Sequence, residues 1–157
     1  MREVYKNNFV GDISDCREGV GDWAVIHACK YPCHRNAVGY DKKISSTHPN
    51  YLVLRKKQNL YLNIIDPDKP LFMNPLFVET LNFCNDYCST PNMKLLFHCN
   101  KGDSRAPSLA LLHLSKNLHI INDSSYEHAA KEYQKIDRFY RPSRGIRIYL
   151  SEHWNEF

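Results

Sequence analysis

The chain has 157 residues, of which 43% are hydrophobic and 24% charged, and its formal net charge is +4. This composition excludes disordered and collagen-like chains, and the length favours one globular domain over residues 1–157. No apolar run approaches the roughly 20 residues of a membrane-spanning helix, so we expect a cytoplasmic protein without membrane contact. The six cysteines are too few for a small disulfide scaffold, which favours reduced thiols with separate roles.

The first half of the chain predicts four short strands. Apolar runs bounded by glycine and aspartate predict strands at 8–11 and 23–28, and further apolar runs predict strands at 51–54 and 60–65. The polar, proline-containing stretch between these pairs, residues 31–50, is expected to be a loop. Prolines directly after residue 65 forbid continuation of the fourth strand.

The second half predicts helices around one further strand. From Asn74 the apolar residues recur at helical spacing, with Asn74 as the N-terminal cap and Pro75 in the first turn. A buried strand is predicted at 93–97 and an apolar helix at 105–117. Two more helices are predicted, one capped near Ser124 or Ser125 and one after Pro142-Ser143.

This alternation indicates an α/β fold of three layers, with a short, mostly parallel sheet and helices on both faces. Ligands bind such sheets beyond the carboxyl ends of the strands. The loops at Cys29, Asp66 and Cys99 are therefore the places to look for a functional site.

The loop after the strand at 93–97 carries the strongest functional signal. Cys99 and Arg105 are separated by five residues at a strand-to-helix turn, with His98 before the thiol. Backbone N–H groups of a tight loop that opens a helix form an anion-binding nest. Arg105 can grip two phosphate oxygens, and the same positive field stabilises a thiolate at Cys99. The loop predicts a nucleophilic cysteine that attacks phosphorus, with His98 supporting the loop and the phosphate bound by residues 100–105: Asn100, Lys101, Gly102, Asp103, Ser104 and Arg105.

The pattern His98-Cys99-x5-Arg105 resembles the signature loop of the cysteine-dependent protein tyrosine and dual-specificity phosphatases. Phe9-Val10-Gly11-Asp12 is similar to the opening strand of the compact dual-specificity members, and the remaining elements follow in family order. The resemblance implies a phosphomonoesterase with a phosphocysteine intermediate on Cys99. It also implies that no metal or cofactor is needed and that the substrate is a phosphorylated protein or another phosphomonoester.

A general acid is also implied by the resemblance, an aspartate on a mobile loop about thirty residues before the nucleophile. Asp66 lies 33 residues before Cys99 and Asp68 lies 31 before it. We favour Asp66 because it directly follows a predicted strand, and Asp68 is the second candidate. The structural alternative is that Asp66-Pro67-Asp68 is only a turn.

Two positions depart from the family pattern. Most members carry Ser or Thr after the arginine, and its hydroxyl donates to the departing thiolate, whereas this chain has Ala106. Arg-Ala-Pro also occurs in the phosphatases of regenerating liver, a slow subgroup, so we expect slow turnover. A phosphate-binding interaction module with negligible turnover is the alternative. Asp103 adds a carboxylate to the loop, which argues against highly charged phosphoinositides as substrates.

The remaining cysteines suggest one redox role. Cys29 follows a predicted strand and emerges at the same sheet edge as Cys99, and a cysteine at the corresponding place in the regenerating-liver phosphatases can form a reversible disulfide with the nucleophile. The alternative is an ordinary packed cysteine. The spacings Cys29-x3-Cys33-His34 and Cys84-x3-Cys88 match zinc motifs poorly, so we expect no metal site.

Four arginines recur every three residues near the C-terminus: Arg138, Arg141, Arg144 and Arg147. A positive surface there favours anionic ligands and keeps open a phosphatase that acts on nucleotide or RNA 5′ phosphates. The alternative is a solvated helix face with structural ion pairs. Nothing in the sequence indicates the oligomeric state.

Overall fold

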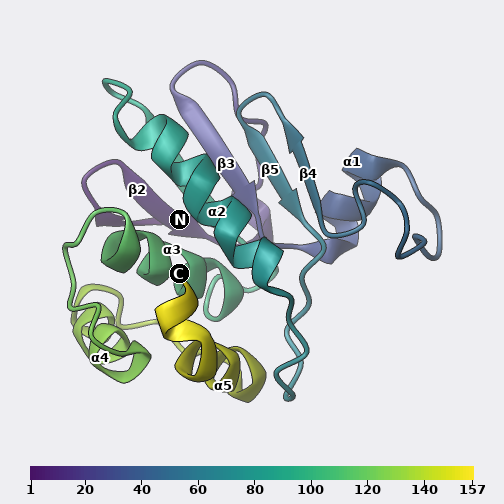
Figure 1. Cartoon of the computed structure of the whole chain (residues 1–157). Helices are drawn as coiled ribbons and strands as arrows, with labels where there is room; N and C mark the ends of the chain where they lie inside the picture. Colours follow the sequence, from purple (N-terminus) through teal and green to yellow (C-terminus); the bar gives the residue numbers. More distant parts are fainter.

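The computed structural model describes residues 1–157, and six strands form one sheet in the order β1-β2-β6-β3-β5-β4 (Figure 1). The central strands β2, β6, β3 and β5 pair in parallel, and the edge strands β1 and β4 pair antiparallel. The prediction of a mostly parallel sheet is confirmed. The bounds are β1 Arg2–Tyr5, β2 Asn8–Gly11, β3 Trp23–His27, β4 Val53–Lys56, β5 Asn59–Leu62 and β6 Lys94–His98.

The strand predictions differ from the structure at the edges of the sheet. The edge strand β1 was not predicted, because only Val4 of its four residues is buried. The pair β4 and β5 turns at 57–58, so β4 begins at Val53 and β5 ends at Leu62. The chain beyond Leu62 is therefore free to leave the sheet before Asp66.

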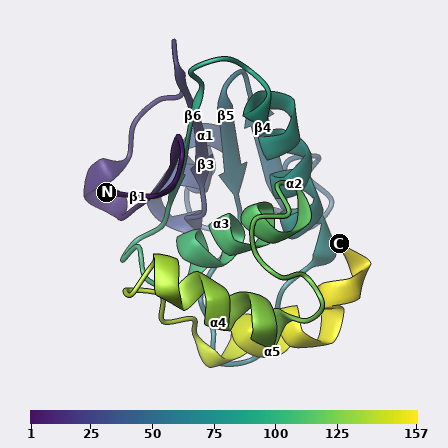
Figure 2. The ribbon, with the colours of Figure 1, turned by 90° about the vertical axis from the view of Figure 1, so that its left-hand side faces the viewer.

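Four helices lie on one face of the sheet, α2 (Asn74–Cys88), α3 (Arg105–Lys116), α4 (Tyr126–Ile136) and α5 (Arg144–His153). The first two pack directly on the strands, whereas α4 packs against α3 and α5 against α4 (Figure 2). A main core of 30 buried residues fills the space between the sheet and these helices. None of the helices is both long enough and apolar enough to cross a membrane.

The helix starts follow their caps. Ser125 accepts a hydrogen bond from the His128 N–H, which confirms the cap predicted near Ser124 or Ser125. The helix predicted after Pro142-Ser143 is α5, and Ser143 caps it by accepting from the Ile146 N–H. The prediction of Asn74 as the N-cap of α2 is wrong by one residue. Its N-cap is Met73, and the Asn74 side chain instead donates to Glu156 near the C-terminus.

The opposite face of the sheet is covered by one short helical segment. Residues Lys30–His34 form a turn, in which the His34 N–H donates to the Cys29 carbonyl at 3.0 Å, and this turn continues into α1 (Arg35–Val38). The prediction of a loop over residues 31–50 is therefore wrong for its first part. There Cys33 and Ala37, one helical turn apart, pack against Tyr61. Both faces are covered as predicted, but the second layer is thin, and the end of β6 lies just beneath it.

Candidate active site

The loop between β6 and α3 wraps around the sulfur of Cys99. The thiol is buried, with 1% of the residue exposed, and the Gly102 N–H donates to its Sγ at 3.2 Å. Gly102 has a φ of +73°, and a Cβ there would meet the Gly11 carbonyl oxygen at 2.8 Å. Only glycine fits this position, because the left-handed backbone and the close approach to β2 both exclude a side chain.

The guanidinium of Arg105 joins the ends of three strands. Its Nη1 donates to the carbonyl oxygens of Ala28 and Ile64, each at 3.2 Å, and its Nη2 donates to Asn100 Oδ1 at 2.7 Å. The Nε is buried and has no hydrogen-bond partner. Since a buried donor without a partner costs free energy, this edge of the guanidinium is suited to an anionic ligand.

The structure brings Asp66, but not Asp68, to this loop. One carboxylate oxygen of Asp66 accepts from the Ser104 hydroxyl at 3.0 Å, and the other lies 3.9 Å from Arg105 Nε. Asp68 is exposed, and its carboxylate makes no hydrogen bond or ion pair. Of the two predicted acids, Asp66 is the one positioned next to the phosphate loop.

The segment after Asp66 rests on the start of α5. The Ser143 hydroxyl donates to the Pro67 carbonyl at 3.5 Å, and a Cβ on Gly145 would overlap the carbonyl oxygens of Pro67 and Lys69. Neither Ser143 nor Gly145 was identified from the sequence. Their contacts depend on how α5 packs, for which the sequence holds no local signal.

Cys29 lies beside the phosphate loop through Asn100. Its Sγ donates to the Tyr31 carbonyl and lies 3.5 Å from Asn100 Oδ1, and Asn100 Nδ2 also donates to that carbonyl at 3.0 Å. Hydrogen bonding from Cys33 lowers the pKa of the Cys29 thiol against the opposing effect of burial, and Arg105 lowers it further. The redox pairing of Cys29 with Cys99 stays a prediction.

His98 points to the other face of the sheet. Its Nε2 lies 2.7 Å from Nδ1 of His27, its register partner on β3, and both rings are buried. Burial lowers the pKa of both imidazoles, that of His98 to about 3. His98 is thus a neutral ring behind the phosphate loop, in agreement with a supporting position.

The outer rim of the loop is basic. Arg2 donates to the Gly102 carbonyl at 2.7 Å while also pairing with the buried Asp137, and the Arg141 N–H donates to the Asp103 carbonyl at 2.7 Å. The four C-terminal arginines singled out from the sequence are exposed and make no ion pair. Of the alternative interpretation, a solvated helix face with structural ion pairs, the solvent exposure is therefore present and the ion pairs are not.

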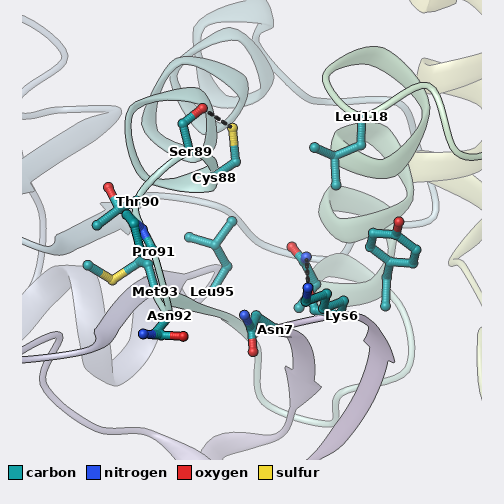
Figure 3. Close-up of a pocket in the computed structure, with 12 residues that line it drawn as sticks. Lys6, Asn7, Cys88, Ser89, Thr90, Pro91, Asn92, Met93, Leu95 and Leu118 are labelled. Atoms are coloured by element: carbon teal, nitrogen blue, oxygen red, sulfur yellow. Dashed lines mark hydrogen bonds between the residues drawn. The ribbon is translucent and has the colours of Figure 1, made fainter.

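A separate cavity of about 420 Å³ lies at the far end of the sheet (Figure 3). It is bounded by the β1–β2 turn with Lys6 and Asn7, and by the end of α2 with Cys88 and Ser89. The parallel strands β2 and β6 begin there, whereas Cys99 follows the end of β6. This cavity is therefore not part of the phosphate loop.

Together these features define an α/β protein with a short mixed sheet whose strand ends carry a Cys-x5-Arg loop. No protein-family model matches the sequence, and no curated protein sequence matches it. Solved structures do: DUSP15 has a TM-score of 0.62 and 15% identity, over 98% of this chain and 86% of that chain. A leucine-rich-repeat and phosphatase domain protein from Entamoeba histolytica has a TM-score of 0.63 and 10% identity, over 98% and 90%.

The human tyrosine phosphatase-like serine/threonine/tyrosine-interacting protein has a TM-score of 0.61 and 18% identity, over 98% of this chain and 95% of that chain. The chain thus has the fold of the dual-specificity phosphatases, as the signature loop indicated. At these identities the similarity establishes the fold and does not establish an activity.

Proposed function

We propose that the protein hydrolyses phosphomonoesters through a phosphocysteine intermediate on Cys99. One observation carries the proposal: the buried Cys99 sulfur already accepts an N–H from its loop, while Arg105 is fixed by three oxygen acceptors and its Nε makes no hydrogen bond. A thiolate and a preorganised cation at one anion nest suit in-line attack on a phosphoryl group.

In the first step the Cys99 sulfur bonds to phosphorus and the phosphorus–ester oxygen bond breaks. Backbone N–H groups of residues 100–105 and the Arg105 guanidinium hold the phosphoryl oxygens. The carboxyl of Asp66 gives its proton to the leaving oxygen, so that the alcohol departs neutral.

In the second step a water oxygen attacks phosphorus and the sulfur–phosphorus bond breaks. Asp66 takes a proton from that water, inorganic phosphate leaves, and the thiolate and the protonated acid are restored. Ala106 supplies no hydroxyl to the departing thiolate, so this step is expected to limit turnover. The chemistry at Cys99 uses no metal or cofactor.

The substrate class we favour is a phosphorylated protein. Two of the solved structures with this fold are named as a phosphatase domain containing protein and as a tyrosine phosphatase-like protein, which supports phosphoprotein substrates. The exposed arginines without ion pairs, of which Arg141 contacts the phosphate loop through its backbone, keep nucleotide and RNA 5′ phosphates as a second substrate class.

A phosphate-binding interaction module is the second candidate function, and Ala106 favours it. Hydrolysis of a generic aryl phosphate by the wild-type chain, abolished in Cys99→Ser and in Arg105→Lys, is the expected result for the enzyme. Binding of phosphate or vanadate by the wild-type chain without hydrolysis would identify the binding module instead. Rates on phosphotyrosine and phosphothreonine peptides, compared with those on 5′-phosphorylated RNA, separate the two substrate classes.

A further inference from the structure

Two cysteines and two histidines meet on the sheet face opposite helices α2 to α5. The ligand atoms of Cys16, His27, Cys33 and His98 all lie within 4.8 Å of one another. His27 and His98 are register partners on β3 and β6, Cys16 follows the 3₁₀ turn Ile13–Asp15, and Cys33 lies in the turn Lys30–His34. The chemistry at Cys99 uses neither cysteine.

The spacing of these atoms approaches that of a tetrahedral zinc site. Zn–S bonds of about 2.3 Å and Zn–N bonds of about 2.05 Å place two sulfurs about 3.8 Å apart and a sulfur and a nitrogen about 3.5 Å apart. The two Sγ atoms are 3.9 Å apart, and Cys16 Sγ is 3.7 Å from His27 Nδ1. The two histidine nitrogens, 2.7 Å apart, need to separate by about 0.6 Å to reach tetrahedral spacing.

The ring of His27 is already oriented to present Nδ1. Its Nε2 donates to Asn59 Oδ1 at 3.0 Å, and the Gly19 N–H donates to the same oxygen at 2.7 Å. Tyr61 stacks on the ring at a centroid distance of 4.2 Å. A carbonyl that accepts the second ring N–H is the usual partner of a metal-bound histidine, because it fixes the tautomer and the ring plane.

The cluster is also reachable from solvent on one side. Cys16, His27 and Cys33 line a cavity of about 440 Å³ that also holds Glu18. His27, Cys33 and His98 are otherwise buried, whereas Cys16 is exposed. A metal ion could therefore enter beside Cys16 and be enclosed by the other three ligands.

We propose that Cys16, His27, Cys33 and His98 bind one Zn²⁺ as a structural site. Binding forms two zinc–sulfur and two zinc–nitrogen bonds. It releases the thiol protons of Cys16 and Cys33 to solvent, and the proton on His98 Nε2 moves to Nδ1. The four ligands leave no position for a substrate, so the ion would join the segment after Gly11, the turn Lys30–His34, β3 and β6 behind the phosphate loop. This inference does not depend on the proposed phosphatase activity.

This proposal departs from the expectation of no metal site. Neither pairing considered from the sequence forms it: His34 instead contacts Tyr40 and the Asn50 carbonyl, and Cys84 is buried in the main core. The set is spread from residue 16 to residue 98: the parallel register of β3 with β6 pairs the two histidines, and two segments outside these strands supply the cysteines.

The test loads the full chain with Zn²⁺ in the presence of a reductant, removes loosely bound metal by dialysis and measures zinc per chain. One equivalent is expected for the wild-type chain and for Cys88→Ser, the matched control, whose thiol is exposed and distant from the cluster. Cys16→Ser and Cys33→Ser should each lose the bound zinc. Asn59→Leu should weaken binding about 10- to 100-fold, because it removes the acceptor that orients His27.

Co²⁺ provides a readout that does not depend on a variant folding. Bound to the wild-type chain, it should show thiolate-to-cobalt charge transfer and the intense visible bands of tetrahedral cobalt. Absence of both spectral features, sub-stoichiometric zinc in the wild-type chain, or equal zinc in Cys16→Ser and the wild type would overturn the proposal. A chain that binds no zinc with reductant and forms a Cys16–Cys33 disulfide without it would show a redox pair instead.

Discussion

The hydroxyl of Ser104 donates a hydrogen bond of 3.0 Å to Oδ1 of Asp66. The same hydroxyl oxygen accepts the N–H of Ser143 at 2.9 Å. One residue of the phosphate loop thus connects the proposed acid with the start of α5. Since a general acid acts only when it is held in position relative to the reacting oxygen, this contact matters for catalysis although Ser104 does no chemistry itself.

Ser104→Ala is therefore expected to lower kcat about tenfold with little change in KM, which corresponds to about 1.4 kcal/mol of transition-state stabilisation. The reason is a less restrained Asp66, while Cys99 and Arg105 keep their contacts. Steady-state hydrolysis of an aryl phosphate measures kcat and KM. Ser89→Ala, at the exposed end of α2, is the control. An unchanged kcat would show that Ser104 does not position the acid.

Substitution of the two aspartates separates their functions. Asp66→Asn should lower kcat by about 10² to 10⁴ while substrate still binds, because only Asp66 contacts the phosphate loop. Asp68→Asn, two residues away and exposed, is the matched control and should leave kcat near the wild-type rate. The pH–rate profile of each variant is the measurement. A large fall in kcat for Asp68→Asn, together with a wild-type kcat for Asp66→Asn, would show that Asp68 is the general acid.

Ala106→Ser tests the second step of the proposed reaction. Ala106 is fully buried in the first turn of α3. A serine there adds a hydroxyl that can donate a hydrogen bond to the departing thiolate. A hydrogen bond of about 0.5–1.5 kcal/mol raises the rate of that step about 2- to 10-fold. Stopped-flow traces should show a smaller burst and a faster steady state. An identical steady-state rate would mean that breakdown of the phosphocysteine is not limited by this position.

The phosphate loop was predictable from the sequence because all of its functional groups are contiguous. A thiol, a glycine and an arginine at fixed offsets between a strand and a helix predict an anion nest without any tertiary information. Asp66 was identified on different grounds: the resemblance implies an acid about thirty residues before Cys99, and a predicted strand ending at residue 65 favours Asp66, although β5 ends at Leu62.

The contacts that hold the loop in place were not predictable. Arg2 reaches the Gly102 carbonyl only because β1 forms the sheet edge and Asp137 binds the guanidinium from 135 residues away. His27 and His98 meet only because β3 and β6 pair in parallel with that register. Each depends on strand order and on helix packing, which local periodicity does not encode.

Gly145→Ala is expected to displace the segment that follows Asp66. A Cβ at this position overlaps the carbonyl oxygens of Pro67 and Lys69. Because alanine otherwise favours a helix, a loss of activity in this variant would be caused by the overlap. We expect kcat/KM to fall about 10- to 100-fold while vanadate binding at the phosphate loop is retained. Ser151→Ala, on the exposed side of α5, is the control. Wild-type kinetics in Gly145→Ala would show that the acid segment tolerates the shift.

His113 should make the protein less stable in mild acid. Burial lowers the pKa of His113 to about 4, from an ordinary value of 6.5, and its Nδ1 faces the Asn117 side-chain amide at 3.0 Å. Between pH 6.5 and 4 the unfolded chain therefore binds more protons than the folded chain. The free energy of unfolding falls as the pH falls through this window.

Replacing the ring removes this contribution. From pH 7 to pH 4.5 the wild-type chain should lose about 2 to 3 kcal/mol more stability than His113→Leu, as measured by urea unfolding at both pH values. His119→Asn, whose parent side chain is 70% exposed, is the control and should follow the wild-type chain. Equal losses in the wild type and in His113→Leu would mean that His113 takes up its proton without unfolding the helix that carries it.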